Sequence, residues 1–154
     1  MIIKFEAFRN SIYYQIQIFR HLFFSNPLNK SGTKYKCQAT KLLVPKTDIH
    51  CDHVVHFFYL VNAFLASENL SDAKCVWLGG TNGFWGLEDR ELDLRWQKYH
   101  LKNAKLRCVC SQFNLKRQKY FTEDYKEKDK ELIKRILELN KSSNSARTCP
   151  IHCL

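Results

Sequence analysis

The chain has 154 residues, of which 45% are hydrophobic and 14% aromatic, so it is long enough for one domain and too rich in apolar residues to be wholly disordered. Its 25 Lys and Arg residues against 15 Asp and Glu residues give a formal net charge of +10. This balance favours an anionic partner, such as nucleic acid, an acidic membrane face or a phosphorylated small molecule, and does not choose among them.

The first part of the chain contains an ambiguous apolar segment, a basic loop and a central helix. Residues 12–24 alternate in part as a strand does, but two aromatic residues break the alternation. Residues 25–41 carry four lysines and no acid among Asn, Pro, Ser and Gly, which predicts an exposed loop. A short strand is expected at 42–44. An almost wholly apolar helix is then expected at about 53–67, with Asp52 as its N-cap.

The remaining chain is predicted to alternate strands with helices. Strand, helix, strand and helix are expected in turn at 76–78, 87–101, 106–110 and 122–140. Thr122 caps the last of these helices, and the Ser- and Asn-rich residues 141–154 predict a disordered tail. The sequence thus predicts one small α/β domain over residues 1–140, with a mixed sheet and flanking helices.

The seven cysteines are odd in number and irregularly spaced, which favours reduced thiols and a cytoplasmic setting over a disulfide framework. Residues 1–10 include Glu6 and Arg9 where a secretory signal needs an apolar run. The longest apolar run, 54–66, is shorter than the roughly 20 residues of a membrane span. We therefore expect a soluble protein without a membrane span.

The segment 76–96 has the most unusual order, because four of the five glycines cluster in it, just before the adjacent acids Glu88 and Asp89. A carboxylate at a helix N-terminus is stabilised in its charged form and can take the proton of an attacking hydroxyl. A plainer interpretation is a helix start with ordinary solvated acids after a glycine turn.

This segment resembles, in a partial and compressed form, the N-G-F…G-x-E-D-x-E-L-x-x-R motif of GT-A glycosyltransferases. The matching positions are Asn82, Gly83, Phe84, Gly86, Glu88, Asp89, Glu91, Leu92 and Arg95. The resemblance implies part of a GT-A fold and an inverting, metal-dependent transfer of a sugar from a nucleotide-sugar to the hydroxyl of a glycan acceptor, or a truncated or inactive relative. By the same resemblance Asp89 is the catalytic base and Glu88 binds the acceptor, while Phe84, Trp85 and Trp96 are candidates for stacking on sugar rings.

A metal site is a further expectation, because GT-A enzymes hold Mn²⁺ or Mg²⁺ with a D-x-D motif after a strand. Asp48, His50 and Asp52 follow the strand expected at 42–44, and alternate residues of an extended segment face one side. A polar loop before the Asp52 cap is the plainer interpretation. Zinc at His50, His53 and His56 or in the Cys149–Cys153 tail lacks the usual ligand spacing.

The leading alternative is a nucleic-acid-binding module. Residues 98–121 contain seven Lys and Arg residues and no acid, with four aromatic residues among them. Basic side chains neutralise phosphates and aromatic rings stack on unpaired bases. The strip matches no known nucleic-acid-binding motif and can equally be a solvated face. A lectin-like domain, suggested by Trp77–Gly80 and the cysteines, lacks a later Trp.

Overall fold

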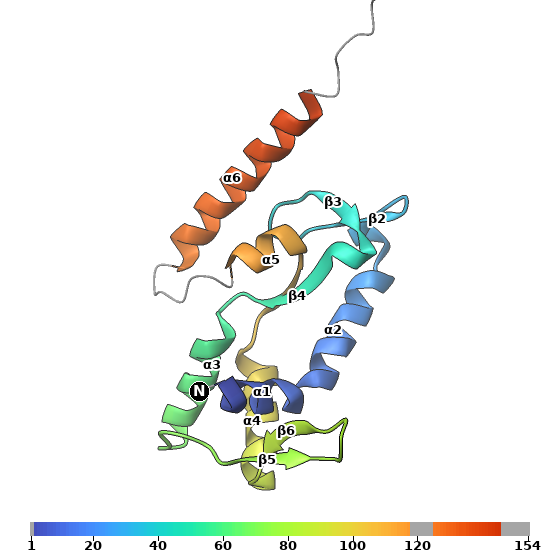
Figure 1. Cartoon of the computed structure of the whole chain (residues 1–154). Helices are drawn as coiled ribbons and strands as arrows, with labels where there is room; N and C mark the ends of the chain where they lie inside the picture. The colour runs from blue at the N-terminus through green and yellow to red at the C-terminus, as the bar shows by residue number, and fades with distance from the viewer. Residues whose placement is uncertain (1, 118–124, 146–154) are drawn as a thin grey trace, which may run out of the picture. The chain divides into compact units, whose positions relative to one another are not determined.

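The computed structural model describes residues 2–117 and 125–145 (Figure 1). Its helices are α1 (Ile2–Ser11), α2 (Tyr13–Ser25), η1 (Pro27–Asn29), η2 (Lys46–Asp48), α3 (Phe57–Ser67), α4 (Arg90–Asn103), α5 (Ser111–Arg117) and α6 (Tyr125–Ser145). Its strands are β1 (Lys30–Ser31), β2 (Lys34–Lys36), β3 (Leu43–Pro45), β4 (Ile49–His53), β5 (Cys75–Leu78), β6 (Phe84–Leu87) and β7 (Leu106–Cys110). The chain is therefore a mixed α/β protein, as the sequence predicts.

The strands form three small sheets instead of the one mixed sheet expected. β1, β2 and β3 make an antiparallel sheet, β5 and β6 make an antiparallel hairpin, and β4 pairs with β7. The strands of the first sheet and of the hairpin follow one another along the chain, whereas α3, β5, β6 and α4 lie between β4 and β7. Most of the buried hydrophobic residues belong to the helices.

The fold separates into two compact units, each taken over its described residues. Unit 1 comprises Met1–Pro27 and Cys51–Arg107, and unit 2 comprises Leu28–His50 and Cys108–Leu154. The sequence had been interpreted as a single domain over residues 1–140. Residues 141–145, where the disordered tail was expected to begin, belong to α6, which continues to Ser145. The Thr122 cap and the Cys149–Cys153 motif lie outside the described residues.

The core of unit 1 is an aromatic cluster centred on Trp96 of α4. Phe8 of α1 and Phe64 of α3 pack their rings against the Trp96 indole, with centroids 5.1 and 5.3 Å away. Phe8, Phe64 and Trp96 are each at most 1% exposed. The apolar helix expected at 53–67 is confirmed as α3, but it begins at Phe57 and its N-cap is His56, not Asp52. Asp52 lies inside β4, where residues are already extended.

The ambiguous segment 12–24 is helical, and Ile12 is the buried joint between α1 and α2. Its apparent alternation is misleading because Tyr14, Ile18 and Leu22, spaced four apart, form an exposed face of α2. The predicted loop at 25–41 contains two short strands, β1 and β2. Its lysines are exposed as expected.

The core of unit 2 joins the end of β7 to α5 and α6. It contains Cys37, Val109, Cys110, Phe113 and Ile136, all at most 2% exposed. The spacing of Tyr125, Leu132, Ile133, Ile136 and Leu139 predicts a buried stripe on this last helix. Ile136 is fully buried and Leu132 and Ile133 are partly buried, but Leu139 is 48% exposed, so the stripe is confirmed only in part. No helix within the described residues combines the length and apolar character needed to cross a membrane.

Candidate functional site

The adjacent acids Glu88 and Asp89 lie at the start of α4. The Asp89 side chain accepts hydrogen bonds from the backbone N–H groups of Glu91 and Leu92 at 2.8 and 3.0 Å, so Asp89 is the N-cap of this helix. Glu88 and Asp89 are both exposed. Capping alone accounts for an acid at this position, because the free backbone N–H groups at a helix start need a hydrogen-bond acceptor. No catalytic role is needed to explain it.

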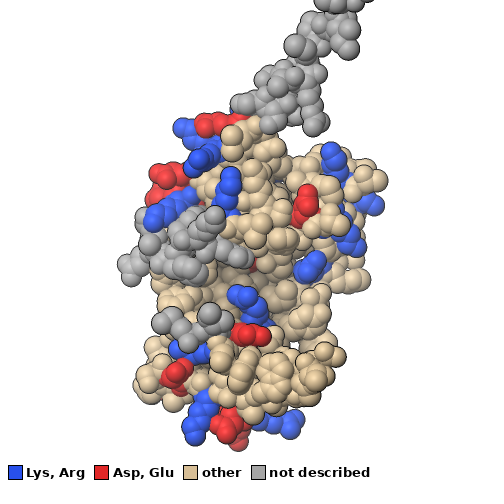
Figure 2. Space-filling view, in the orientation of Figure 1, with Lys and Arg blue, Asp and Glu red and all other residues tan. Residues whose placement is uncertain are grey.

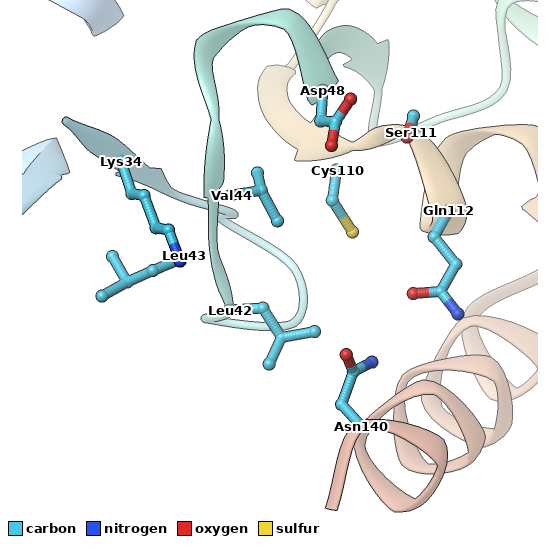
Figure 3. A pocket seen from close by; sticks show the side chains of 9 residues that line it. All are labelled: Lys34, Leu42, Leu43, Val44, Asp48, Cys110, Ser111, Gln112 and Asn140. Atoms are coloured by element: carbon cyan, nitrogen blue, oxygen red, sulfur yellow. The ribbon is translucent and has the colours of Figure 1, made fainter. Parts of the chain in front are cut away.

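Two cavities stand out in the described residues, and Glu88 and Asp89 line neither of them. One, of about 420 Å³, lies in unit 2 (Figure 3). Its lining is Lys34, Leu42, Leu43, Val44, Asp48, Cys110, Ser111, Gln112 and Asn140. The other, of about 280 Å³, lies in unit 1 between α2 and the end of α4 and has an apolar lining. Neither of these two cavities therefore lies at the acid pair, and its role in binding an acceptor sugar stays a prediction.

The expected substrate-binding residues 82–85 belong to the β5–β6 hairpin. Asn82 and Gly83 are in its turn, Phe84 is 51% exposed, and Trp85 packs edge-on against Trp77 with centroids 5.6 Å apart. Gly83 is required by packing, because a Cβ there would lie 2.4 Å from the carbonyl oxygen of Leu78. The hairpin therefore presents aromatic surface, and its residues line neither of the two cavities described above.

The two other expected substrate ligands have structural partners. Arg95 forms ion pairs with Glu68 at 2.8 Å and with Glu91 at 3.8 Å. Trp96 is fully buried, so its ring cannot stack on a sugar. The prediction that Trp96 contacts substrate is wrong, because α1 and α3 cover the indole on the sides where a ligand would need to enter.

The expected metal ligands do not form a common cluster. No group of three or more His, Cys, Asp and Glu side chains suited to a metal occurs among the described residues. Asp52 pairs with Arg107 at 3.0 Å in unit 1, whereas Asp48 lines the unit 2 cavity. Asp48, His50 and Asp52 thus have separate surroundings among the described residues, and the D-x-D-like site for Mn²⁺ or Mg²⁺ stays a prediction.

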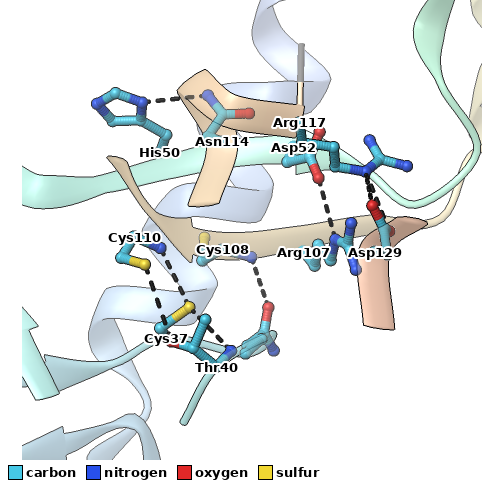
Figure 4. A network of polar contacts seen from close by, with 11 residues as sticks. Cys37, Thr40, His50, Asp52, Arg107, Cys108, Cys110, Asn114, Arg117 and Asp129 are labelled. Atoms are coloured by element: carbon cyan, nitrogen blue, oxygen red, sulfur yellow. Dashed lines mark hydrogen bonds and ion pairs between the residues drawn. The ribbon is translucent and has the colours of Figure 1, made fainter. Parts of the chain in front are cut away.

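The three histidines considered for zinc each have a different partner. His50 Nδ1 lies 3.1 Å from Asn114 Nδ2 (Figure 4). His53 Nε2 lies 2.8 Å from His100 Nε2, and His56 caps α3. Burial lowers the pKa of His100 from 6.5 to about 4. Spacing by three residues does not bring these rings together because the first two are in a strand, not a helix.

A thiol pair that the sequence analysis missed lies in unit 2 (Figure 4). The backbone N–H groups of Thr40 and Cys110 donate to Cys37 Sγ at 3.3 and 3.2 Å. The Cys110 thiol also donates to Cys37, and these hydrogen bonds lower the pKa of Cys37 to about 5 against the opposing effect of burial. The same hydrogen bond raises the pKa of Cys110. Cys37 and Cys110 are 73 residues apart, and no local motif announces their contact.

The basic strip at 98–121 is not one continuous surface. Arg107 pairs with Asp52, and Arg117 pairs with Asp129 at 2.8 Å while being 2% exposed. Phe113 is fully buried and cannot stack on a base. The strip retains Lys98, Lys102 and Lys105 as exposed residues of unit 1, whereas Lys119 to Phe121 lie outside the described residues.

The positive charge is concentrated in unit 2. Its described residues include thirteen Lys and Arg and five Asp and Glu, whereas those of unit 1 include ten and eight. Three of the unit 2 lysines, Lys30, Lys34 and Lys36, are exposed on β1 and β2. On the face shown in Figure 2, Lys and Arg side chains are interspersed with Asp and Glu and do not merge into one field.

No protein-family model matches the chain, and no curated protein or solved structure is significantly similar to it. The partial likeness to GT-A glycosyltransferases therefore stays a prediction from the motif. Function has to be argued from the charges, cavities and side-chain contacts of the two units.

Proposed function

We propose that this protein binds nucleic acid through the phosphate backbone, using the exposed lysines of the β1–β2 hairpin. The observation that carries the proposal is the uneven distribution of charge. Among the described residues, Lys and Arg exceed Asp and Glu by eight in unit 2 and by two in unit 1. Exposed lysines release counterions from phosphates on binding, which supplies affinity without a base-specific motif.

The geometry of the hairpin suits this role. Lys34 and Lys36 are alternate residues of β2, so both side chains leave the same face of the sheet. Lys30 pairs with Tyr35 on the neighbouring strand, so its side chain leaves the other face of the same exposed hairpin. No acid occurs between Asn29 and Thr47, so no carboxylate in this segment reduces the positive electrostatic potential of these lysines.

The test compares two triple variants that remove the same charge from different places. Fluorescence anisotropy with labelled single- and double-stranded oligonucleotides measures the affinity of the whole chain between about 50 and 200 mM salt. One variant is Lys30→Gln, Lys34→Gln and Lys36→Gln in the hairpin. The matched control is Lys98→Gln, Lys102→Gln and Lys105→Gln, three exposed lysines of unit 1.

The hairpin variant is expected to flatten the dependence of log K on log salt by about 2 to 3 for duplex DNA, as loss of three phosphate contacts requires. The control variant should retain the slope of the original chain. If the slope of log K against log salt became smaller only in the control variant, the binding surface would be at Lys98, Lys102 and Lys105 instead. Absence of binding at low salt, or equal slopes in all three proteins, would overturn the proposal.

The contact between His50 and Asn114 favours a second, narrower candidate, hydrolysis of a phosphodiester bond. His50 is partly exposed, and Asn114 is 6% exposed on α5 and holds the ring at Nδ1. Because the Asn114 amide nitrogen donates to Nδ1, the neutral ring carries its proton on Nε2 and can donate it to the oxygen of the leaving group. In this candidate His50 is the general acid and Asn114 is its positioning residue.

Cleavage of labelled DNA and RNA, with and without Mg²⁺ or Mn²⁺, tests this candidate on a denaturing gel. His50→Ala should reduce the rate by about 100-fold or more, as loss of a general acid does. His21→Ala is the matched control, because His21 is exposed and bonds only locally to Ser25. An original chain that leaves both nucleic acids intact would exclude hydrolysis and leave the binding proposal standing.

Sugar transfer is separated from both proposals by a thermal-shift comparison. UDP- and GDP-sugars with Mn²⁺ should leave the unfolding temperature unchanged if nucleic acid is the partner. Metal-dependent stabilisation that is lost in Asp89→Asn would favour the glycosyltransferase hypothesis instead. This substitution suits the test because Asn also caps a helix, so α4 remains intact.

A further inference from the structure

We propose that Cys37 and Cys110 form an oxidation site, at which hydrogen peroxide entering the unit 2 cavity converts the two thiols into a disulfide. The proposal is independent of nucleic-acid binding. It rests on the contact between the two cysteines, on the donors that surround Cys37, and on the opening of the cavity onto Cys110.

The surroundings of Cys37 stabilise negative charge on its sulfur. Backbone N–H groups of Thr40 and Cys110 point at Sγ, and the Cys110 thiol adds a third donor. Cys37 has no exposed surface, so no water competes for these donors. A buried cysteine that only fills space has no need for three donors on its sulfur, and burial alone raises a thiol pKa.

Cys75 provides an internal comparison. Its sulfur donates to the carbonyl oxygen of Ala73, and burial and the charge of Asp72 raise its pKa. It therefore stays a thiol where Cys37 favours the thiolate. The contrast arises from the backbone around each residue, because amide groups face Cys37 and a carbonyl faces Cys75.

Access to the pair is through Cys110. Its side chain is 2% exposed and lines the cavity of about 420 Å³ together with Ser111 and Gln112 (Figure 3). Thr40 Oγ1 lies 3.8 Å from Cys110 Sγ on the inner side. A small oxidant such as hydrogen peroxide can reach a sulfur at the wall of this cavity, whereas a thiol with so little exposure is closed to a bulky disulfide such as oxidised glutathione.

The reaction balances with one peroxide. The Cys37 thiolate attacks an oxygen of a peroxide molecule that has entered past Cys110, the O–O bond breaks, and the departing hydroxide takes the Cys110 thiol proton as water, which leaves Cys37 as a sulfenic acid. The Cys110 thiolate then attacks the Cys37 sulfur, the S–O bond breaks, and hydroxide leaves. Both sulfurs are oxidised by one electron each, and the peroxide is reduced to water and hydroxide.

The test uses the whole chain with Cys149→Ser and Cys153→Ser, so that these two thiols cannot compete. After stoichiometric peroxide at pH 7, peptide mass spectrometry under non-reducing conditions should find residues 37 and 110 linked, with the loss of two hydrogens. Linkage should be at least about tenfold faster than oxidation of Cys75 in the same sample. Dithiothreitol should restore both thiols, and oxidised glutathione should form the link far more slowly.

Two outcomes would overturn the proposal. One is a peroxide-treated chain in which Cys37 and Cys110 stay reduced while Cys75 is oxidised. The other is oxidation of Cys110 to sulfinic acid without any link to Cys37. Neither outcome depends on a variant at the pair, so misfolding of Cys37→Ser cannot obscure the result. Cys75→Ser is the control substitution and should leave the yield of the disulfide unchanged.

Discussion

His53 and His100 share a hydrogen bond of 2.8 Å between their Nε2 atoms, although they are 47 residues apart. Gln15 fixes the direction of this bond. Its amide nitrogen donates to the carbonyl oxygen of Gln97, so its oxygen accepts the Nδ1 proton of His100 at 2.7 Å. His100 Nε2 then has only a lone pair to offer, and it accepts the proton of His53 Nε2. The network is complete only while His100 is neutral.

Acid should therefore destabilise the fold through His100. Its pKa is about 4 in the fold and 6.5 as a free side chain, so between these values the unfolded chain binds the extra proton. The stabilising contribution is fully present above pH 6.5 and is lost as the pH falls towards 4, up to about 3 kcal/mol. Urea unfolding at several pH values should show that the free energy of unfolding falls less with decreasing pH in His100→Gln than in the original chain.

His21→Gln is the control for this pH dependence, because His21 is exposed on α2. The control should follow the original chain throughout the range from pH 7 to 4. An identical pH profile for His100→Gln and the original chain would show that His100 does not resist protonation in the fold.

The Trp96 indole N–H should contribute measurably to stability. It donates to the carbonyl oxygen of Phe8 at 2.9 Å inside the buried aromatic cluster. Trp96→Phe leaves that oxygen without its partner and removes one ring, which should cost about 2 to 3 kcal/mol of unfolding free energy. Trp77→Phe is the comparison, because Trp77 is 46% exposed. This substitution should cost less than about 1 kcal/mol of unfolding free energy.

The helices were the predictable part of this fold because their signals are local. The apolar run of α3 and the stripe of Ile136 on α6 are visible within a few turns of sequence. The start of α3 was misplaced because Asp52 satisfies the usual N-cap composition, while its carboxylate is taken by Arg107 at a separation of 55 residues. Contacts at such distances along the chain leave no local pattern.

In the candidate sites, too, the sequence predicts features with a local signal and misses features that depend on contacts between distant segments. Asp89 stands at a helix start, as its sequence position suggests, and the structure adds that its carboxylate is occupied as a cap. The sequence could not show that Trp96 is buried or that Cys37 meets Cys110, because both depend on packing between distant segments. Motif matching identifies residue types in order, whereas a site also needs a cavity and free side-chain atoms.

Asp89→Ala should destabilise the protein by about 1 kcal/mol, because two amide groups at the start of α4 lose their acceptor. Asp89→Ser should restore most of this stability, since a Ser side chain can also cap. Thermal unfolding of the two variants beside the original chain measures the difference. Equal stability of the Ala and Ser variants would mean that capping is not the main role of this carboxylate.

The glycines of the β5–β6 hairpin are expected to differ sharply in their tolerance of alanine. A Cβ at Gly83 would lie 2.4 Å from the Leu78 carbonyl oxygen and 2.7 Å from that of Gly79, so the backbone has to shift. Gly80 has no atom within 4 Å of such a Cβ. Gly83→Ala should therefore cost about 1 to 3 kcal/mol and Gly80→Ala about 0.5 kcal/mol or less, measured by urea unfolding. Similar values for both would contradict the close approach in this turn.

The ion pair between Arg117 of α5 and Asp129 of α6 should be the charged contact most sensitive to substitution in unit 2. Arg117 Nε donates to both carboxylate oxygens at 2.8 and 3.1 Å, and the guanidinium packs over the Tyr125 ring at 5.7 Å. Asp129→Asn removes the carboxylate charge that faces this buried guanidinium, which should cost about 3 to 5 kcal/mol of unfolding free energy, with little dependence on salt.

Glu127→Gln is the matched control on the same helix, because Glu127 pairs with Lys130 at 2.8 Å where both side chains are about 70% exposed. Solvent screens this pair, so its loss should cost less than about 1 kcal/mol and matter even less at high salt. Urea unfolding at low and high salt measures both effects. If Asp129→Asn proved as mild as Glu127→Gln, the α5–α6 contact would have to depend on the apolar packing around Ile136 instead of on this buried pair.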